Sequence, residues 1–255
     1  MDLQLRDKTV MVTGAGRGLG RAIGMAFAAE GANVAFHYNS SAKGADEAAK
    51  EVAGFGVRAI AVGADLADGQ AVKSAVEKVK AQLGPIDILI NNSAVTQSKP
   101  FLETTEEDWG PQVDITVTGT LRVAQAVARQ MVESEVPGAI VNLMGDSGRV
   151  GESRLLVTAT TRSTTLGLTK SLAKELARYK IRANAVSIAL VQTGTLNAHT
   201  GHADDEKMKR ILSAYPLRRF GRPEDVTPTI LLLASPLSSW TTGQVLSVNG
   251  GYSMP

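Results

Sequence analysis

Four glycines follow an apolar run near the N-terminus, and their spacing points to phosphate binding. The apolar residues 9–12 lead directly into residues 13–20, which read TGAGRGLG, and a stretch with helical spacing of apolar residues comes next. Glycine lets the backbone approach a ligand closely, and a helix N-terminus offers free N–H groups with a partial positive charge. The segment is therefore predicted to bind the pyrophosphate of a dinucleotide, with tight packing as the alternative role of the glycines.

A second set of residues bears on which dinucleotide this would be. In a typical NAD-binding unit an acidic residue about 20 positions after the glycines binds the ribose 2′-OH. Here no Asp or Glu lies between Glu30 and Asp46, Arg17 sits inside the glycine segment, and the next apolar run ends at Asn39 and Ser40. A 2′-phosphate prefers a cation and polar donors, so these residues favour NADP(H) over NAD. A solvated loop charge is the alternative for Arg17.

The elements that must position these residues alternate along the whole chain. Strands are expected at residues 10–13, 33–38, 58–63, 86–91, 139–144, 182–187 and 245–248. Helices are expected at residues 21–30, 42–54, 69–83, 121–134, 158–179 and 225–234. Such alternation predicts an α/β protein: a Rossmann-type, doubly wound parallel sheet of about seven strands with helices on both faces. No linker divides the chain, so residues 1–255 are predicted to form one dinucleotide-binding domain, with ligands at the carboxyl ends of the strands.

Composition restricts the partners and the chemistry. The 255 residues are 44% hydrophobic and 20% charged, with a net charge of +2 and no cysteine. A nucleic-acid-binding face needs clustered basic residues, and disulfides, thiolate catalysis and cysteine metal sites need cysteine. No apolar run reaches the roughly 18 residues that a membrane span requires. A cytoplasmic protein without a nucleic-acid or membrane partner is expected.

These motifs together resemble the short-chain dehydrogenase/reductase family, close to its 3-oxoacyl-acyl-carrier-protein reductase branch, over essentially the whole chain. The matching segments lie at residues 13–20, 65–66, 91–94, 181–186, 221–225 and 243–245. The resemblance implies an NADP(H)-binding fold and an oligomer, either a homotetramer or a hetero-oligomer with a homologous subunit. Together with the residues chosen above, it implies cofactor contacts at Gly14, Arg17, Gly18, Leu19, Gly20, Asn39, Ser40, Asp65, Leu66, Asn92 and Thr193.

The chain differs from the family at the positions of the catalytic residues. The family uses Asn, Ser, Tyr and Lys, in which the lysine lowers the pKa of the tyrosine that protonates the substrate oxygen. With residues 140–143 and 167–173 as anchors, these positions fall on Thr116, Gly145, Thr158 and Arg162. All four family residues are thus expected to be replaced.

The replacements predict a change of chemistry at the hydride end of the site. A threonine hydroxyl is a much weaker acid than a phenol, and the permanently charged Arg162 cannot relay protons but can bind ribose, phosphate or an oxyanion. Asp146 and Ser147 follow Gly145 and are further catalytic candidates, with turn capping as their alternative role. Ordinary carbonyl reduction by the family mechanism is therefore not expected.

Residues 194–215 are predicted to form a lid over the substrate. His199 and His202 lie there, but no third ligand suggests a metal site. The basic residues Lys207, Lys209 and Arg210 could meet a carrier protein or its phosphopantetheine arm, or form an ordinary solvated face. The expected partner is a small-molecule or carrier-bound substrate.

Three functions remain open from the sequence. The first is altered non-redox chemistry on a carbonyl-type substrate, such as cyclisation, isomerisation or elimination, with bound NADP(H) in a structural role. The second is a catalytically silent subunit paired with an active homologue. The third is an atypical NADP-dependent oxidoreductase with another proton donor.

Overall fold

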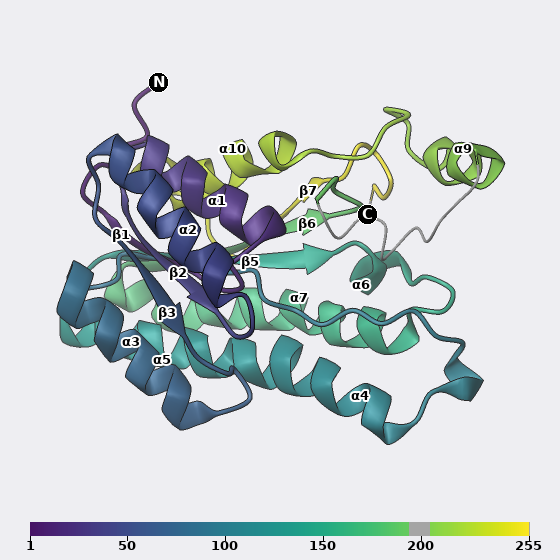
Figure 1. Cartoon of the computed structure of the whole chain (residues 1–255), viewed down its shortest axis with the longest axis horizontal. Coiled ribbons are helices and arrows are strands. Elements are labelled where there is room, and N and C mark those ends of the chain that lie inside the picture. Colours follow the sequence, from purple (N-terminus) through teal and green to yellow (C-terminus); the bar gives the residue numbers. More distant parts are fainter. Residues whose placement is uncertain (194–204, 255) are drawn as a thin grey trace.

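Seven parallel strands form one continuous sheet in the computed structural model, which describes residues 1–193 and 205–254 (Figure 1). The strand order is β3-β2-β1-β4-β5-β6-β7. The strands are β1 (Thr9–Val12), β2 (Asn33–Tyr38), β3 (Ala59–Gly63), β4 (Ile88–Asn91), β5 (Gly138–Gly145), β6 (Ile181–Ile188) and β7 (Val245–Val248). The prediction of a doubly wound, Rossmann-type parallel sheet is confirmed.

Helices cover both faces of this sheet (Figure 1). On one face lie α1 (Gly18–Ala29), α2 (Ala42–Val52) and α10 (Pro223–Ala234). On the other face lie α3 (Gly69–Leu83), α5 (Thr120–Glu133) and α7 (Leu156–Leu176). The shorter helices are α4 (Glu106–Gln112), α6 (Ser147–Val150) and α9 (Asp205–Ser213).

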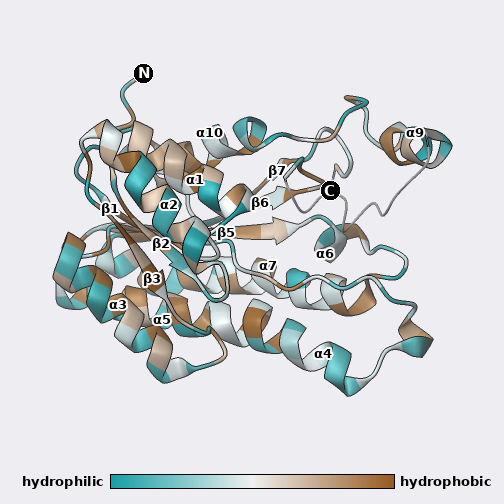
Figure 2. Ribbon diagram, viewed as in Figure 1, coloured by the Kyte–Doolittle hydropathy of each residue, from teal (hydrophilic) through white to brown (hydrophobic). Residues whose placement is uncertain are grey.

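Alternate side chains of each strand pack into two separate apolar cores. Val10 and Val12 pack with α1 and α10 in one core, whereas Met11 packs with α3 and α5 in the other. Because both faces are covered, the strands are apolar along almost their whole length. Figure 2 shows this pattern as brown strands between helices whose outward faces are hydrophilic.

The chain reverses its direction of winding at β1. Val10 pairs with Val34 of β2 on one side and with Ile88 of β4 on the other. In open α/β sheets such a switch point leaves a crevice beyond the carboxyl ends of the strands. The topology therefore fixes where a ligand site must be sought.

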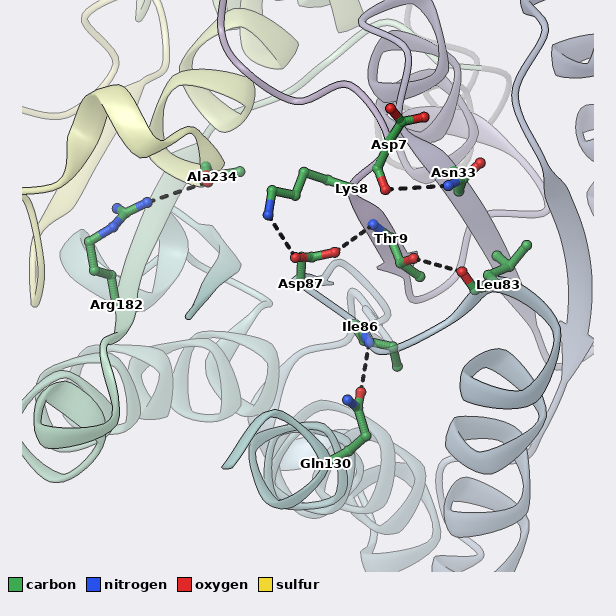
Figure 3. Close-up of polar contacts among 10 residues, drawn as sticks. All are labelled: Asp7, Lys8, Thr9, Asn33, Leu83, Ile86, Asp87, Gln130, Arg182 and Ala234. Atoms are coloured by element: carbon green, nitrogen blue, oxygen red, sulfur yellow. Dashed lines mark hydrogen bonds and ion pairs between the residues drawn. The ribbon is translucent and has the colours of Figure 1, made fainter. Parts of the chain in front are cut away.

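Polar groups at the opposite, amino end of the sheet bind one another (Figure 3). The Asp87 carboxylate accepts from Lys8 Nζ at 2.9 Å and from the Thr9 backbone N–H at 2.8 Å. The Ile86 N–H donates to Gln130 Oε1 at 2.8 Å.

The Arg182 guanidinium, at the start of β6, donates to the carbonyls of Leu233 (2.8 Å), Ser235 (3.0 Å), Thr241 (3.2 Å) and Ala234 (3.4 Å). It thereby satisfies carbonyls that the end of α10 leaves without partners.

Element types were predicted well and element ends less well. Helix α1 begins at Gly18 rather than at residue 21, and α7 begins and ends slightly before the predicted 158–179. The short helices α4, α6 and α9 were not predicted, nor was the π-helical segment Val113–Gly119 between α4 and α5. No helix among residues 1–193 and 205–254 is both long enough and apolar enough to cross a membrane.

Candidate functional site

A pocket of about 960 Å³ lies over the carboxyl ends of the strands, at the β1/β4 switch point. The glycine segment after β1 lines one end. Residues after β5 and from α7 line the other end, together with Tyr215 and Tyr252 from the C-terminal part of the chain. The pocket thus has a cofactor-sized extension and a second, chemically distinct end.

The glycine segment forms a tight turn that only glycine can make. Gly14 and Gly18 have φ angles of +64° and +57°, in the left-handed region. A Cβ at Gly20 would lie 2.4 Å from the Gly14 carbonyl oxygen. Arg17 precedes α1 without a side-chain cap, so the first N–H groups of α1 remain available to a phosphate.

His37, at the end of β2, holds this turn in place. Its Nδ1 accepts from the Gly14 N–H at 3.2 Å, and its Nε2 lies 3.1 Å from the Ala64 carbonyl oxygen. This pairing requires the neutral ring with the proton on Nε2. Burial lowers the pKa of His37 to about 4, which keeps the ring neutral at physiological pH. His37 was not among the residues predicted from the sequence, although a histidine within an apolar strand was a usable signal.

Most of the predicted cofactor residues line the pocket. They are Gly14, Arg17, Gly18, Leu19, Gly20, Asn39, Ser40, Leu66, Asn92 and Thr193. Arg17, Asn39 and Ser40 are exposed at its rim, which suits a group that reaches out toward solvent. Asp65 is not among the lining residues, and its carboxylate accepts from the Ala67 N–H at 2.9 Å.

Threonine hydroxyls fix the loop of residues 92–99, which follows β4 without helix or strand and contributes to the pocket wall. Thr13 Oγ1 accepts from the N–H groups of Asn92 (2.9 Å) and Ser93 (3.0 Å). Thr116 Oγ1 accepts from Val95 N–H, and Thr158 Oγ1 accepts from Gln97 N–H, each at 3.2 Å. The backbone of the 92–99 loop is thus held by side chains instead of by a neighbouring strand.

Thr116 and Thr158, which stand at two of the four aligned catalytic positions, use their hydroxyls to hold the 92–99 loop. Thr158 lines the pocket, but its hydroxyl donates to Gln112 Oε1 at 2.6 Å while it accepts from Gln97. Thr116 is buried within the π-helical segment and is not among the lining residues. π-Helical turns often occur near functional sites, where they re-aim a side chain. Here the turn directs Thr116 to the 92–99 loop.

Arg162 is partly buried and lines the pocket. Its Nη2 donates to Thr96 Oγ1 at 3.3 Å, and its Nε is buried without a hydrogen-bond partner among the described residues. No carboxylate of the described chain forms an ion pair with it. Burial lowers the pKa of Arg162 to about 10, so the group remains charged at neutral pH.

The loop after β5 carries the remaining predicted candidates. Asp146 is buried and accepts from Ser187 Oγ and, at 2.5 Å, from Asn249 Nδ2, so the protein itself satisfies this carboxylate. Ser147 also lines the pocket, and its hydroxyl has no hydrogen-bond partner within the described part of the chain. Gly145, the last residue of β5, lies beside Arg162 and Ser147, and a Cβ built on it would be in ordinary van der Waals contact with both.

The structure adds a carboxyl–phenol group that the sequence analysis missed. Glu152 and Tyr252 line the pocket, where the Tyr252 hydroxyl lies near enough to the Glu152 carboxyl group to affect its pKa. Burial is the main cause that raises the pKa of Glu152 above its ordinary value, and the pKa of Tyr252 is raised to about 12, also mainly by burial. The ring of Tyr215 lies 5.1 Å from that of Tyr252. Glu152 and Tyr252 lie 100 positions apart in the sequence, so no local pattern could have indicated that they are close together.

The predicted lid is described only in part. Residues 194–204, with His199 and His202, lie outside the described residues. In the described part, Ile211 of α9 and Tyr215 line the pocket, so this segment borders the site. Lys209 pairs with Glu206 at 3.6 Å, and both side chains are exposed, as is Arg210.

The doubly wound sheet, the glycine turn at its first strand and the pocket at its switch point define a Rossmann-type α/β protein with a nucleotide-sized site. The chain belongs to the short-chain dehydrogenase/reductase superfamily. Residues 14–253 match the family model described as enoyl-(acyl carrier protein) reductase.

Relatives across this superfamily are similar over nearly the whole chain. L-xylulose reductase from Bos taurus is 38% identical over 252 residues, which cover 99% of each chain. The 3-oxoacyl-(acyl-carrier-protein) reductase from Staphylococcus epidermidis is 35% identical over 248 residues, 97% of this chain and all of the relative. A gluconate 5-dehydrogenase from Burkholderia cenocepacia, solved with NADP and tartrate, superimposes with a TM-score of 0.91 at 27% identity, covering 98% of this chain and 97% of the other.

Proposed function

We propose that this protein binds NADP(H) and acts on a carbonyl-type substrate, free or carrier-bound, by chemistry other than the phenol-assisted hydride transfer of its family. One observation carries the proposal: the hydroxyls of Thr116 and Thr158 are used to hold the 92–99 loop. Thr158 stands where the alignment places the family's tyrosine, and its proton is already donated to Gln112. A side chain in this state is not a proton donor for a substrate.

The basic residue at the lysine position supports the same conclusion. In the family, lysine depresses the pKa of a phenol, and here the aligned tyrosine position beside Arg162 in the sequence is Thr158. As a permanent cation aimed at the pocket, Arg162 can instead stabilise negative charge on a substrate oxygen, as charged donors in enclosed sites do. Polarisation of a carbonyl of this kind serves isomerisation, cyclisation and elimination.

NADP(H) is the proposed cofactor because of the residues at the pocket rim. Arg17, Asn39 and Ser40 surround the place where an NAD-specific carboxylate would be, and a 2′-phosphate suits such donors. The relative solved with NADP supports this choice. In our proposal the bound dinucleotide completes the pocket wall and does not exchange a hydride.

Titration with NADPH and NADH, followed by the fluorescence of the nicotinamide, tests the cofactor. NADPH is expected to bind at least about tenfold more tightly, and Arg17→Ala should reduce that preference, since one charge-assisted contact contributes on the order of 1.5 kcal/mol or more. Lys43→Ala removes a cation that is exposed nearby in α2 and serves as the control. Absence of binding at millimolar NADPH would contradict the proposal.

NADPH consumption with a panel of ketones, hydroxyketones and acyl thioesters tests the chemistry. The unmodified protein is expected to consume NADPH no faster than the protein-free control. The triple change Gly145→Ser, Thr158→Tyr and Arg162→Lys should create measurable reduction. Robust reduction by the unmodified protein would favour the atypical oxidoreductase instead.

A silent subunit is the second candidate, favoured by exposed apolar side chains outside the pocket. Leu102 is 95% exposed and Trp240 is 99% exposed, and Leu121 at the start of α5 is half exposed. Large exposed apolar side chains of this kind contribute to association where they form a contiguous patch. Mass measurement of the protein alone and mixed with its closest genomic homologue tests this: a mixed oligomer supports the candidate, whereas only homo-oligomers count against it.

A further inference from the structure

Arg162 is a partly buried cation, and among residues 1–193 and 205–254 no carboxylate forms an ion pair with it. The one side-chain hydrogen bond found there, to Thr96, is long at 3.3 Å, and the buried Nε has no partner in that part of the chain. An enclosed charge without compensation destabilises a fold, whereas the same charge paired with an anion does not. The missing anion is therefore expected to come from outside the chain.

The acidic residues of the same pocket do not supply that anion. Asp146 is occupied by Ser187 and Asn249. Glu152 lies beside Tyr252 and has no cation beside it among the described residues. Neither forms an ion pair with Arg162, although both line the pocket with it.

Residue 145, beside Arg162, is a glycine at the edge of the pocket. A Cβ built there would lie 3.9 Å from Arg162 Nε, 3.8 Å from its Cγ and 3.6 Å from Ser147 Oγ. Gly145, Ser147 and Arg162 all line the pocket. The pocket therefore adjoins both the Arg162 cation and the Ser147 hydroxyl, for which the described residues provide no hydrogen-bond partner.

From this arrangement we infer that Arg162 binds a carboxylate group of the substrate, with Ser147 as a second donor. A planar guanidinium matches a planar carboxylate with two parallel N–H donors, whereas a neutral carbonyl would leave the charge uncompensated. The phosphates of the dinucleotide are expected at the glycine turn, at the other end of the pocket. The substrate class is then a carboxylic acid, such as an oxo acid or a hydroxy acid. The inference rests on the proposed function only in taking this pocket as the substrate site.

Binding of malonate tests the inference without knowledge of the natural substrate. Malonate is titrated by calorimetry into the NADP⁺-loaded protein at constant ionic strength, with malonamide as its neutral counterpart and inorganic phosphate as a tetrahedral anion. Saturable binding of malonate alone is expected. Arg162→Met should weaken it at least about tenfold, and Arg162→Lys, which keeps the charge but loses the planar donor pair, should weaken it less.

Arg149→Met is the matched control. Arg149 also lies beside the β5 end, but its guanidinium donates to Ser247 Oγ and to the Val245 carbonyl, and it does not line the pocket. Malonate affinity should be unchanged in this variant. Ser147→Ala should give a smaller loss than Arg162→Met.

Several results would overturn the inference. They are absence of saturable malonate binding, equal binding of malonamide, preference for phosphate, or unchanged malonate affinity in Arg162→Met. A loss of NADP⁺ affinity in Arg162→Met with malonate affinity retained would assign Arg162 to the cofactor instead. The NADPH-consumption assay is a separate readout, so reduction of ketones would refute the proposed function while leaving carboxylate binding intact.

Discussion

Two arginines at opposite ends of the sheet differ in how the protein treats their charge. Arg182, at the amino end, donates to four backbone carbonyls, one of which, Ala234, is drawn in Figure 3. Within the part of the chain that the structure describes, Arg162, at the carboxyl end, has one long side-chain hydrogen bond and a buried Nε without a partner. Both are partly removed from solvent, so the difference lies in the partners and not in burial alone.

This contrast distinguishes polar groups that stabilise the fold from polar groups that are available to bind a ligand. At the amino end Asp87, Lys8 and Gln130 also bind within the protein. Buried polar groups are normally satisfied, and an exception calls for a specific reason. A pocket beside the exception supplies that reason, since a ligand can provide the partner that the chain omits.

Replacing each arginine by methionine is expected to give the largest change in the free energy of unfolding, and it tests the comparison most directly. Arg182→Met should lower the free energy of unfolding by about 2–4 kcal/mol, because several carbonyls lose their donor. Arg162→Met should leave it unchanged or raise it by roughly 1 kcal/mol, because an uncompensated charge is removed. Urea unfolding measures both. Equal losses in the two variants would remove the distinction.

His37 sharpens the comparison, because it lies at the carboxyl end yet is fully paired. Its pKa is about 4 in the fold and about 6.5 when unfolded, so the unfolded state takes up a proton first. The resulting stabilisation is complete above pH 6.5 and is lost as the pH falls from about 6.5 to 4, a change on the order of 2–3 kcal/mol. In His37→Asn this part of the pH dependence should disappear. Urea unfolding at several pH values measures it, and an unchanged pH profile would contradict the assignment.

A substitution of Asp87 tests what the amino end of the sheet contributes to stability. Asp87→Ala removes the acceptor of Lys8 and of the Thr9 N–H, and the free energy of unfolding should fall by about 1–2 kcal/mol. Asp46→Ala, at an exposed position of α2, should change it by less than about 0.5 kcal/mol. NADPH affinity should be unaffected in both variants. A loss of affinity in Asp87→Ala would show that the two ends of the sheet are coupled.

Glu152 gives the smallest expected effect. Its pKa is raised in the fold, so the protonated form is favoured and stability is lost as the pH rises through the folded pKa. Glu152→Gln should therefore melt slightly higher than the unmodified protein at neutral pH and at the same temperature in acid. The difference is small because much of the carboxyl group remains in contact with solvent. A lower melting temperature at neutral pH would show that the charged form is stabilised instead.

The sequence sufficed for the fold because its evidence is local. Runs of apolar residues such as those of β1 and β2 and the glycines after β1 predict strands and a turn without knowledge of the rest of the chain. Helix α4 was missed because it is short and contains Pro111, and the π-helical segment has no periodicity of its own.

The site was predictable only where one motif contains it. The residues of the glycine turn were found, but the partners that define their surroundings were not. His37 contacts Gly14 across 23 residues and Gln97 contacts Thr158 across 61. Whether Arg162 has a partner depends on every element around the pocket, so its residue type alone could not reveal that no carboxylate of the described residues pairs with it.

The 92–99 loop has a consequence for local motion. Its Val95 and Gln97 amides are bound by the buried hydroxyls of Thr116 and Thr158, which come from two different elements packed on the sheet. Amide hydrogens exchange with solvent at rates set by the opening of their hydrogen bonds. These two amides should therefore exchange deuterium as slowly as those of a core strand, in a segment that has no regular secondary structure.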